Sequence, residues 1–149
     1  MRVLFVTSSG GHLAHLWALR SWWHAHERHW ICEDEASGRQ RLDGETVTWL
    51  KGPFQRSGRG LVRGLAVAPR VLRATRPDVV ISTGAAIAVP VFLWARLLGI
   101  PTVFIEVIDR VDAPSLTGRI LGPLASRVVL HWPEQQASYP TGTVLGPLW

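Results

Sequence analysis

The feature that most constrains the fold is an apolar stretch that runs directly into a glycine-rich turn and then into a helix-like segment. Residues 3–6 are apolar, as in a strand that is buried on both faces. Ser-Ser-Gly-Gly-His follows at 8–12, and a helix-like run extends over 13–22. Glycines let a ligand approach the backbone closely, and the unpaired N–H groups at a helix start favour negative charge. The pattern therefore predicts an α/β sheet that binds a polar ligand at its edge.

The same turn excludes two common nucleotide-binding motifs. The third glycine of the dinucleotide fingerprint is missing, and no Gly-Lys-Ser/Thr follows as it would in a P-loop. His12 instead places a titratable ring at the carboxyl end of the first strand, where open α/β sheets bind their ligands. With an ordinary pKa close to neutral, the ring could act as a general base on a hydroxyl group. The alternative is a histidine that only hydrogen-bonds its own turn.

Strand-like and helix-like segments alternate along the rest of the chain. This alternation predicts an α/β fold with a mostly parallel sheet, right-handed crossovers and helices on both faces, in one domain over residues 1–149. We expect strands at 2–7, 30–33, 46–50, 78–82, 101–106 and 127–131, and helices at 12–23, 60–76, 86–97 and 115–122.

One stretch is apolar enough to suggest a membrane span, because Arg96 is the only charged residue between Val79 and Ile105. However, Ser-Thr-Gly at 82–84 and Gly-Ile-Pro at 99–101 divide it into strand, turn, helix, turn and strand. A buried β-α-β unit has this pattern because both faces of its strands are covered. We therefore expect a buried part of the sheet here.

The chain has a net charge of +5, which favours an anionic partner such as an acidic membrane surface, a phosphorylated substrate or a nucleic acid. We expect no nucleic acid, because no recognition motif is present. The only cysteine, Cys32, excludes an internal disulfide and favours a reducing compartment. The histidines near residue 26 have no Cys or carboxylate at metal-ligand spacing, so we expect no metal site.

The positive charge is concentrated between Lys51 and Arg76, where no acidic residue occurs. A helix there would turn the arginines to one face and leave Leu61 and Val62 among the residues that cover its other sides. This basic face suits a membrane or a pyrophosphate group, or it is simply the solvated face of a helix that covers the sheet. Its members are Arg56, Arg59, Arg63, Arg70 and Arg73.

Three further positions could carry chemistry. Glu106 ends an apolar strand, and a carboxylate there is costly unless it is paired or faces the ligand. Arg110, four residues later, could neutralise it, so a buried ion pair that fixes the loop is the alternative. Thr83 and Gly84 end another strand in a turn of small residues, which would lie beside the first turn and suits a phosphate or a sugar edge. We expect His15 to be a packing residue or a residue that supports the site from behind, and Asp109 and Asp112 to be loop or cap residues.

Several motifs occur together in the order found in one known family. The chain resembles the acceptor-side subunit of the split UDP-N-acetylglucosamine transferase of dolichol-linked oligosaccharide synthesis, and its bacterial capsule and exopolysaccharide homologues. The motifs are Ser-Ser-Gly-Gly-His at 8–12, Arg-Pro-Asp-Val-Val-Ile at 76–81, Leu-Leu-Gly-Ile at 97–100, Ile-Glu at 105–106 with Arg110, Ser-Leu-Thr-Gly at 115–118, Trp-Pro-Glu-Gln at 132–135 and Tyr-Pro at 139–140.

The resemblance implies a Rossmann-like N-terminal half of a GT-B glycosyltransferase that is divided over two polypeptides and is active only with its partner. The partner would carry the UDP-sugar site, and this chain would bind the lipid-pyrophosphate acceptor without a cofactor. His12 and Glu106 would be catalytic, and the basic face would contact the membrane or the pyrophosphate. Substrate contacts would come from Ser9, Gly10, Gly11, Thr83, Gly84 and Arg110. The partner would dock on Leu145, Leu148 and Trp149.

The resemblance also bears on location and specificity. The eukaryotic relatives have an N-terminal membrane anchor, and none is evident here, so we expect a cytoplasmic protein attached peripherally at the inner face of the plasma membrane. His131 and Val107 stand where the family pattern has glutamine and serine, which fits a bacterial polysaccharide enzyme that transfers another sugar. The alternative function is a non-catalytic scaffold that tethers and activates a partner transferase.

Overall fold

Seven parallel strands form one sheet in the computed structural model, which describes residues 1–55 and 57–147. The strand order is β3-β2-β1-β4-β5-β6-β7. The bounds are Arg2–Thr7 for β1, Glu27–Glu33 for β2, Val47–Leu50 for β3, Val79–Ser82 for β4, Thr102–Ile105 for β5, Arg127–Leu130 for β6 and Thr143–Val144 for β7.

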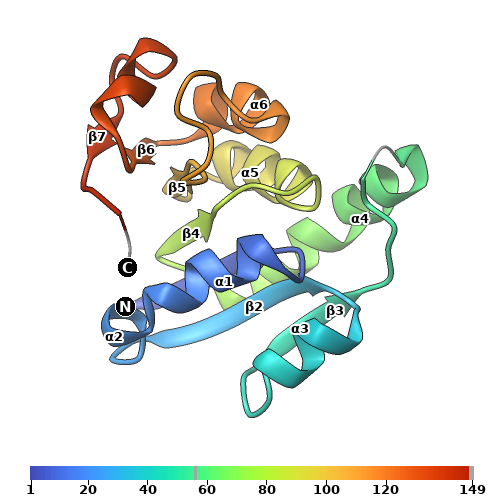
Figure 1. Cartoon of the computed structure of the whole chain (residues 1–149). Helices are drawn as coiled ribbons and strands as arrows, with labels where there is room; N and C mark the ends of the chain where they lie inside the picture. Colours follow the sequence, from blue (N-terminus) through green and yellow to red (C-terminus); the bar gives the residue numbers. More distant parts are fainter. Residues whose placement is uncertain (56, 148–149) are drawn as a thin grey trace.

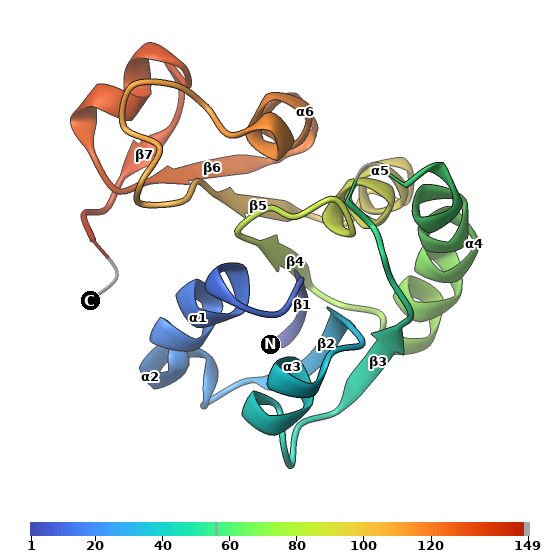
Figure 2. The same cartoon turned by 45° about the vertical axis from the view of Figure 1, so that its right-hand side comes forward.

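The helices form two layers, one on each face of the sheet (Figures 1 and 2). One face carries α1 (Gly11–Ala18), α2 (Arg20–Trp23) and α3 (Ala36–Arg41), and the other carries α4 (Gly58–Thr75), α5 (Ala88–Leu97) and α6 (Leu116–Leu124). A short 3₁₀ helix, η1 (Pro133–Ala137), joins β6 to β7.

The chain changes direction within the sheet between β1 and β4. From β1 it proceeds to β2 and β3 at one edge, and α4 then carries it back to β4, beside β1. From β4 it proceeds the other way through β5 and β6 to β7. Ligands of open parallel sheets bind at the carboxyl ends of the strands where the order reverses. The loops after β1 and β4 therefore lie at the position where a ligand is expected.

The predicted fold class is confirmed, with helices on both faces of a parallel sheet. The helix expected at 12–23 is interrupted at Leu19, where the chain turns and Trp23 becomes buried. Three elements were not predicted: α3, η1 and β7. Each is too short to develop a periodic pattern, since α3 has six residues and β7 only two.

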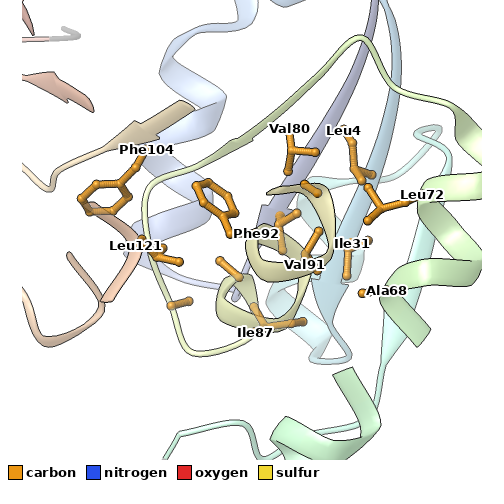
Figure 3. Packing of buried hydrophobic residues seen from close by; sticks show 14 of the residues in the cluster. Leu4, Ile31, Ala68, Leu72, Val80, Ile87, Val91, Phe92, Phe104 and Leu121 are labelled. Atoms are coloured by element: carbon orange, nitrogen blue, oxygen red, sulfur yellow. The ribbon is translucent and has the colours of Figure 1, made fainter. Parts of the chain in front are cut away.

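Alternate residues of the strands fill two cores. Leu4, Val80 and Phe104 face α4, α5 and α6, whereas Phe5 and Ile105 face the opposite layer. Figure 3 shows the first core, in which α5 inserts Val91 and Phe92 toward the sheet. In the second core the rings of Phe5 and Trp30 stack with their centroids 4.4 Å apart.

The long apolar stretch forms β4, α5 and β5, as expected. Three of the four residues in each of its strands are buried, as is one side of α5. Within the described ranges, no helix combines the length and the apolarity that crossing a membrane requires.

Candidate functional site

The turns after β1 and β4 meet at His12. Gly10 has φ +83°, a left-handed conformation that glycine adopts without strain, and it turns the chain from β1 into α1. His12 is the second residue of α1, and its Nδ1 lies 3.0 Å from the carbonyl oxygen of Thr83. The Thr83 hydroxyl in turn donates to the carbonyl of His12 at 3.0 Å. These bonds join two segments that are 71 residues apart in the chain.

The surroundings of His12 favour a neutral ring. Burial lowers the pKa of His12 below the usual 6.5, while the hydrogen bond to Thr83 and the charges of Glu106 and Asp109 oppose this shift. Burial prevails because an imidazolium loses hydration when the protein covers it. A neutral imidazole near pH 7 has the form that a general base needs.

A cleft opens beside His12 at the carboxyl ends of the strands. It contains about 1080 Å³ of empty space, part of it open to solvent. One wall is α1, and the other is the segment that leads from β5 into α6. The lining residues are Gly11, His12, His15, Gln55, Val107, Asp109, Arg110, Ser115, Leu116 and Thr117.

Glu106 lies behind this cleft and is fully buried. Its carboxylate accepts hydrogen bonds from the Tyr139 hydroxyl and from the backbone N–H groups of Val107, at 2.9 Å, and Ser115, at 3.1 Å. Burial, and then the neighbouring carboxylate, raise the pKa of Tyr139, so its hydroxyl remains protonated and donates. Glu106 thus holds together the two ends of the loop that lines the cleft.

The expected neutralisation of Glu106 by Arg110 is not observed. Among the ion pairs of residues 1–55 and 57–147, none joins these two side chains. The reason is that hydrogen-bond donors from Tyr139 and the backbone already surround the carboxylate. Arg110 is exposed and lines the cleft. The Arg110 side chain is therefore placed where it could contact a substrate in the cleft, as predicted from the resemblance.

The Trp-Pro-Glu-Gln motif at 132–135 also holds the loop that leads from β5 into α6. Gln135 is buried, and its amide nitrogen donates to the carbonyls of Val107, at 3.2 Å, and Arg110, at 3.1 Å. Its amide oxygen accepts from the backbone of His131 and Trp132. This motif contributes to the family resemblance, but the sequence does not indicate what Gln135 does, because its partners lie 25 and 28 residues away.

Of the other predicted substrate contacts, some line the cleft and others lie elsewhere. Gly11 lines the cleft, whereas the Ser9 hydroxyl donates to Glu35 in front of α3. Thr83 and Gly84 are buried against His12, and a side chain on Gly84 would put its Cβ 3.1 Å from His12 Cε1. Both residues thus support the histidine. Gly10, exposed at the start of α1, lines a separate pocket between α1 and α3.

Two lining residues, His15 and Asp109, had weaker claims in the sequence. Burial lowers the pKa of His15, and the charges of His131 and His12 lower it further. The His15 and His131 rings lie edge to face with centroids 6.1 Å apart. Asp109 is exposed, and its charge acts on both His12 and His15. The i, i+3 spacing of the two histidines on one helix could have signalled that they share a wall.

The basic face occupies the solvent side of α4. Arg59, Arg63, Arg70 and Arg73 are exposed, and Arg56 lies outside the described residues. Leu61 and Val62, which were expected on other sides of the helix, are also exposed, at 43% and 66%. The buried side instead consists of smaller residues and Leu72, and Gly64 allows α4 to pack closely against Pro90 of α5. The exposed surface of α4 therefore includes both arginines and aliphatic side chains.

The predicted partner strip is described in part. Leu145 is 68% exposed, and its N–H donates to the Leu130 carbonyl at the end of β6. Leu148 and Trp149 lie outside the described residues. As for metals, no group of three or more His, Cys, Asp or Glu side chains in residues 1–55 and 57–147 is arranged to hold an ion.

The chain matches known proteins at the level of sequence. A family described as "Oligosaccharide biosynthesis protein Alg14 like" matches residues 51–148. The UDP-N-acetylglucosamine transferase subunit ALG14 of Mus musculus is 38% identical over 84 residues, which are 52% of this chain and 38% of that protein. The pyrophosphoryl-undecaprenol N-acetylglucosamine transferase of Moorella thermoacetica is 40% identical over 78 residues, or 52% of this chain and 20% of that enzyme.

The fold also matches solved structures. UDP-GlcNAc 2-epimerase from Methanocaldococcus jannaschii has a TM-score of 0.77 at 14% identity, over 99% of this chain and 46% of the enzyme. MurG from Acinetobacter baumannii has a TM-score of 0.73 at 19% identity, over 90% of this chain and 43% of MurG. These likenesses confirm the Rossmann-like fold, in which the chain corresponds to about half of each enzyme.

Proposed function

The chain belongs to the Alg14-like family of oligosaccharide biosynthesis proteins, and from that premise we propose that it is the acceptor-binding component of a two-part glycosyltransferase. The observation that carries the proposal is His12, held neutral beside an open cleft at the reversal of strand order. Relatives that are named N-acetylglucosamine transferases support the reaction class. The chain spans less than half the length of those relatives, so the activity, the substrates and the partner are all parts of the proposal.

In the proposed reaction, a hydroxyl group of the acceptor enters the cleft next to His12. The hydroxyl oxygen attacks the anomeric carbon of a UDP-sugar, and the bond from that carbon to the UDP oxygen breaks with its electron pair, which leaves with UDP. The hydroxyl proton passes to the neutral imidazole. The UDP-sugar is supplied by a partner subunit that completes the site.

The acceptor that we propose is a lipid-linked pyrophosphate. Arg110 lines the cleft and can pair with phosphate oxygens. Gly10 and Gly11 form the start of α1, which no side chain of the described residues caps, so its N–H groups suit an anion. The predicted substrate contacts also include Ser9, Thr83 and Gly84. Thr83 and Gly84 would act indirectly, by supporting His12. The transferred sugar is N-acetylglucosamine or a related sugar.

The same proposal places the chain in the cytoplasm, peripherally at the inner face of the plasma membrane. Arginines can bind anionic lipid headgroups while aliphatic side chains enter the interface, and α4 exposes both kinds of residue. Arg56 and the arginines of α4 would make this contact. The predicted partner strip begins at Leu145. In this arrangement residues 1–149 act as one domain, the acceptor half of the enzyme.

The test is sugar transfer by the chain together with its partner. A complex that contains His12→Ala should form normally but transfer sugar from a UDP donor to a lipid-linked acceptor about 10²- to 10⁴-fold more slowly. His24→Ala, which alters an exposed histidine away from the cleft, is the matched control and should retain full transfer. Unchanged transfer by His12→Ala would instead favour the alternative function, a scaffold that activates the partner without chemistry of its own.

A further inference from the structure

The turn that follows β4 surrounds one edge of the His12 ring. Nδ1 lies 3.0 Å from the Thr83 carbonyl oxygen and 3.4 Å from the Thr83 hydroxyl oxygen. Cε1 lies against Gly84, where an added Cβ would be 3.1 Å away. Nε2 forms none of the hydrogen bonds found among residues 1–55 and 57–147. The Nδ1–Cε1 edge of the ring therefore contacts the turn. His12 is at the same time one of the residues that line the cleft.

These contacts fix which ring nitrogen carries the proton. A carbonyl oxygen can only accept, so Nδ1 must donate to Thr83. The Thr83 hydroxyl hydrogen is already directed at the His12 carbonyl, at 3.0 Å, so the hydroxyl presents its lone pair to Nδ1. Both oxygens near Nδ1 thus require a hydrogen on that nitrogen. The neutral ring then has its lone pair on Nε2.

The turn itself is built to hold this carbonyl in place. The Ser82 hydroxyl donates to the Val6 carbonyl at 2.7 Å and accepts from the Gly84 N–H at 3.1 Å, which ties the turn to β1. Gly84 has φ +115°, a conformation that side chains disfavour. Ala85 has φ +71°, a left-handed conformation that is uncommon for a residue with a side chain. Backbone conformations of this kind persist where the surroundings enforce them.

We propose that Thr83 is the positioning residue of the site: it holds His12 in the Nδ1–H form, so that Nε2 offers its lone pair to the acceptor hydroxyl. The carbonyl fixes the proton, and the hydroxyl fixes the first turn of α1, which carries the ring. Thr83 touches neither substrate and acts only through His12. The catalytic part of this inference depends on the proposed function, whereas the tautomer is a property of the chain alone.

The other charged and titratable groups near His12 leave this assignment intact. Glu106 and Asp109 act on the ring through their charges, from the segment after β5, and His15 lies one turn further along α1. Among the described residues, the hydrogen bonds of the His12 ring go to Thr83, and none joins it to Glu106 or Asp109. The Glu106 carboxylate is occupied by Tyr139 and by two backbone N–H groups.

The direct test is the tautomer of His12 in the ¹⁵N-labelled chain, read from two-bond ¹H–¹⁵N correlations at a pH above the His12 pKa. His12→Ala identifies the resonances. The expected spectrum is that of the Nδ1–H form, whereas neutral histidine in water favours Nε2–H. An Nε2–H spectrum overturns the proposal. This readout needs no partner and no substrate, so it is independent of whether the transfer reaction exists.

The second test separates positioning from general stability. Thr83→Val removes the hydroxyl at nearly constant volume, and we expect kcat for sugar transfer to fall roughly 10- to 100-fold, by analogy with residues that orient metal-bound histidines. Thr83→Ser should restore kcat. Thr75→Val, which removes a hydroxyl that donates to the Val71 carbonyl within α4, is the matched control. Equal kcat for Thr83→Val and the wild type, in a complex where His12→Ala is inactive, overturns the positioning role.

Discussion

His12 and Glu106 follow two strands that are separated only by β4, and their surroundings use them in opposite ways. Glu106 is fully buried, and three hydrogen bonds from Tyr139, Val107 and Ser115 satisfy its carboxylate. His12 is bonded through one ring nitrogen to Thr83 and lines the open cleft. In the sequence, the two residues had similar claims to catalysis.

The difference teaches how to separate an anchor from a reactive group. A buried charge is tolerated where donors fully satisfy it, and such a carboxylate has little capacity left for a substrate. A ring that is satisfied at one atom and open at another is oriented yet still able to react. We therefore assign Glu106 to holding the loop that lines the cleft, and the transfer measurements below test the catalytic role that the family resemblance implies for it.

The largest effect on stability should follow from removal of the Glu106 carboxylate. Glu106→Ala leaves the Tyr139 hydroxyl and two backbone N–H groups without their acceptor, and we expect it to lower the free energy of unfolding by about 3 kcal/mol. Urea-induced unfolding, followed by tryptophan fluorescence, measures the change. Glu134→Ala removes an exposed carboxylate on η1 and should change stability by less than about 0.5 kcal/mol. Equal effects for the two variants would contradict the anchoring role of Glu106.

Gln135 should rank next, because it supports the same loop with both ends of its amide. We expect Gln135→Ala to cost about 2 kcal/mol of unfolding free energy and to raise KM for the acceptor, since the loop that carries Arg110 is no longer fixed. The control is Gln136→Ala, an exposed neighbour with a single bond to the Gly142 carbonyl. A wild-type KM together with wild-type stability would show that the loop does not depend on Gln135.

Tyr139→Phe sharpens the comparison by removing a single hydroxyl. The ring stays in place near Phe104, while Glu106 loses one of its three donors. We expect a loss of about 1–2 kcal/mol in unfolding free energy and unchanged transfer per folded molecule. Thermal unfolding and a transfer assay on the same sample measure both quantities. A loss of transfer without a loss of stability would show that Glu106 and Tyr139 take part in the transfer reaction and do not merely hold the loop.

The smallest effect is on the pH dependence of stability. Burial lowers the pKa values of His12, His15 and His29 below the usual 6.5. The unfolded chain therefore binds protons first as the pH falls below 6.5, and stability should decrease until the pH passes below the folded pKa values. Urea unfolding at about pH 7.5 and about pH 5.5 tests the sign. The double variant His12→Gln, His15→Gln should show a weaker dependence, and an increase in stability toward acid would contradict the burial of these rings.

The sequence was sufficient for the parts of the fold that depend on local pattern. The strand, glycine turn and helix at residues 2–22 predicted the position of His12, and the small-residue turn after β4 was expected beside it. Both expectations hold in the structure, where Thr83 and His12 share hydrogen bonds. Glycine turns at strand ends are local signals, so a single sequence can carry them.

The other features of the fold and of the site depend on contacts between residues far apart in the chain, which cannot be inferred from a single sequence. The role of Glu106 is set by Tyr139, which lies 33 residues later, so the sequence favoured the nearer Arg110 as its partner. The exposure of Leu61 and Val62 depends on the close packing of α4 against α5, which selects small residues for the buried side. The six residues of α3 bury only Gly38, so no apolar stripe marks them as a helix.

The most direct test of the division between His12 and Glu106 is to measure sugar transfer and unfolding for the same two variants. For His12→Gln in the complex with its partner, we predict a loss of transfer of about 10²-fold or more, with unfolding free energy within about 1 kcal/mol of the wild type. For Glu106→Gln we predict nearly normal transfer per folded molecule and a loss of about 2 kcal/mol in unfolding free energy. The opposite result, normal transfer by His12→Gln and lost transfer by a stable Glu106→Gln, would contradict the account.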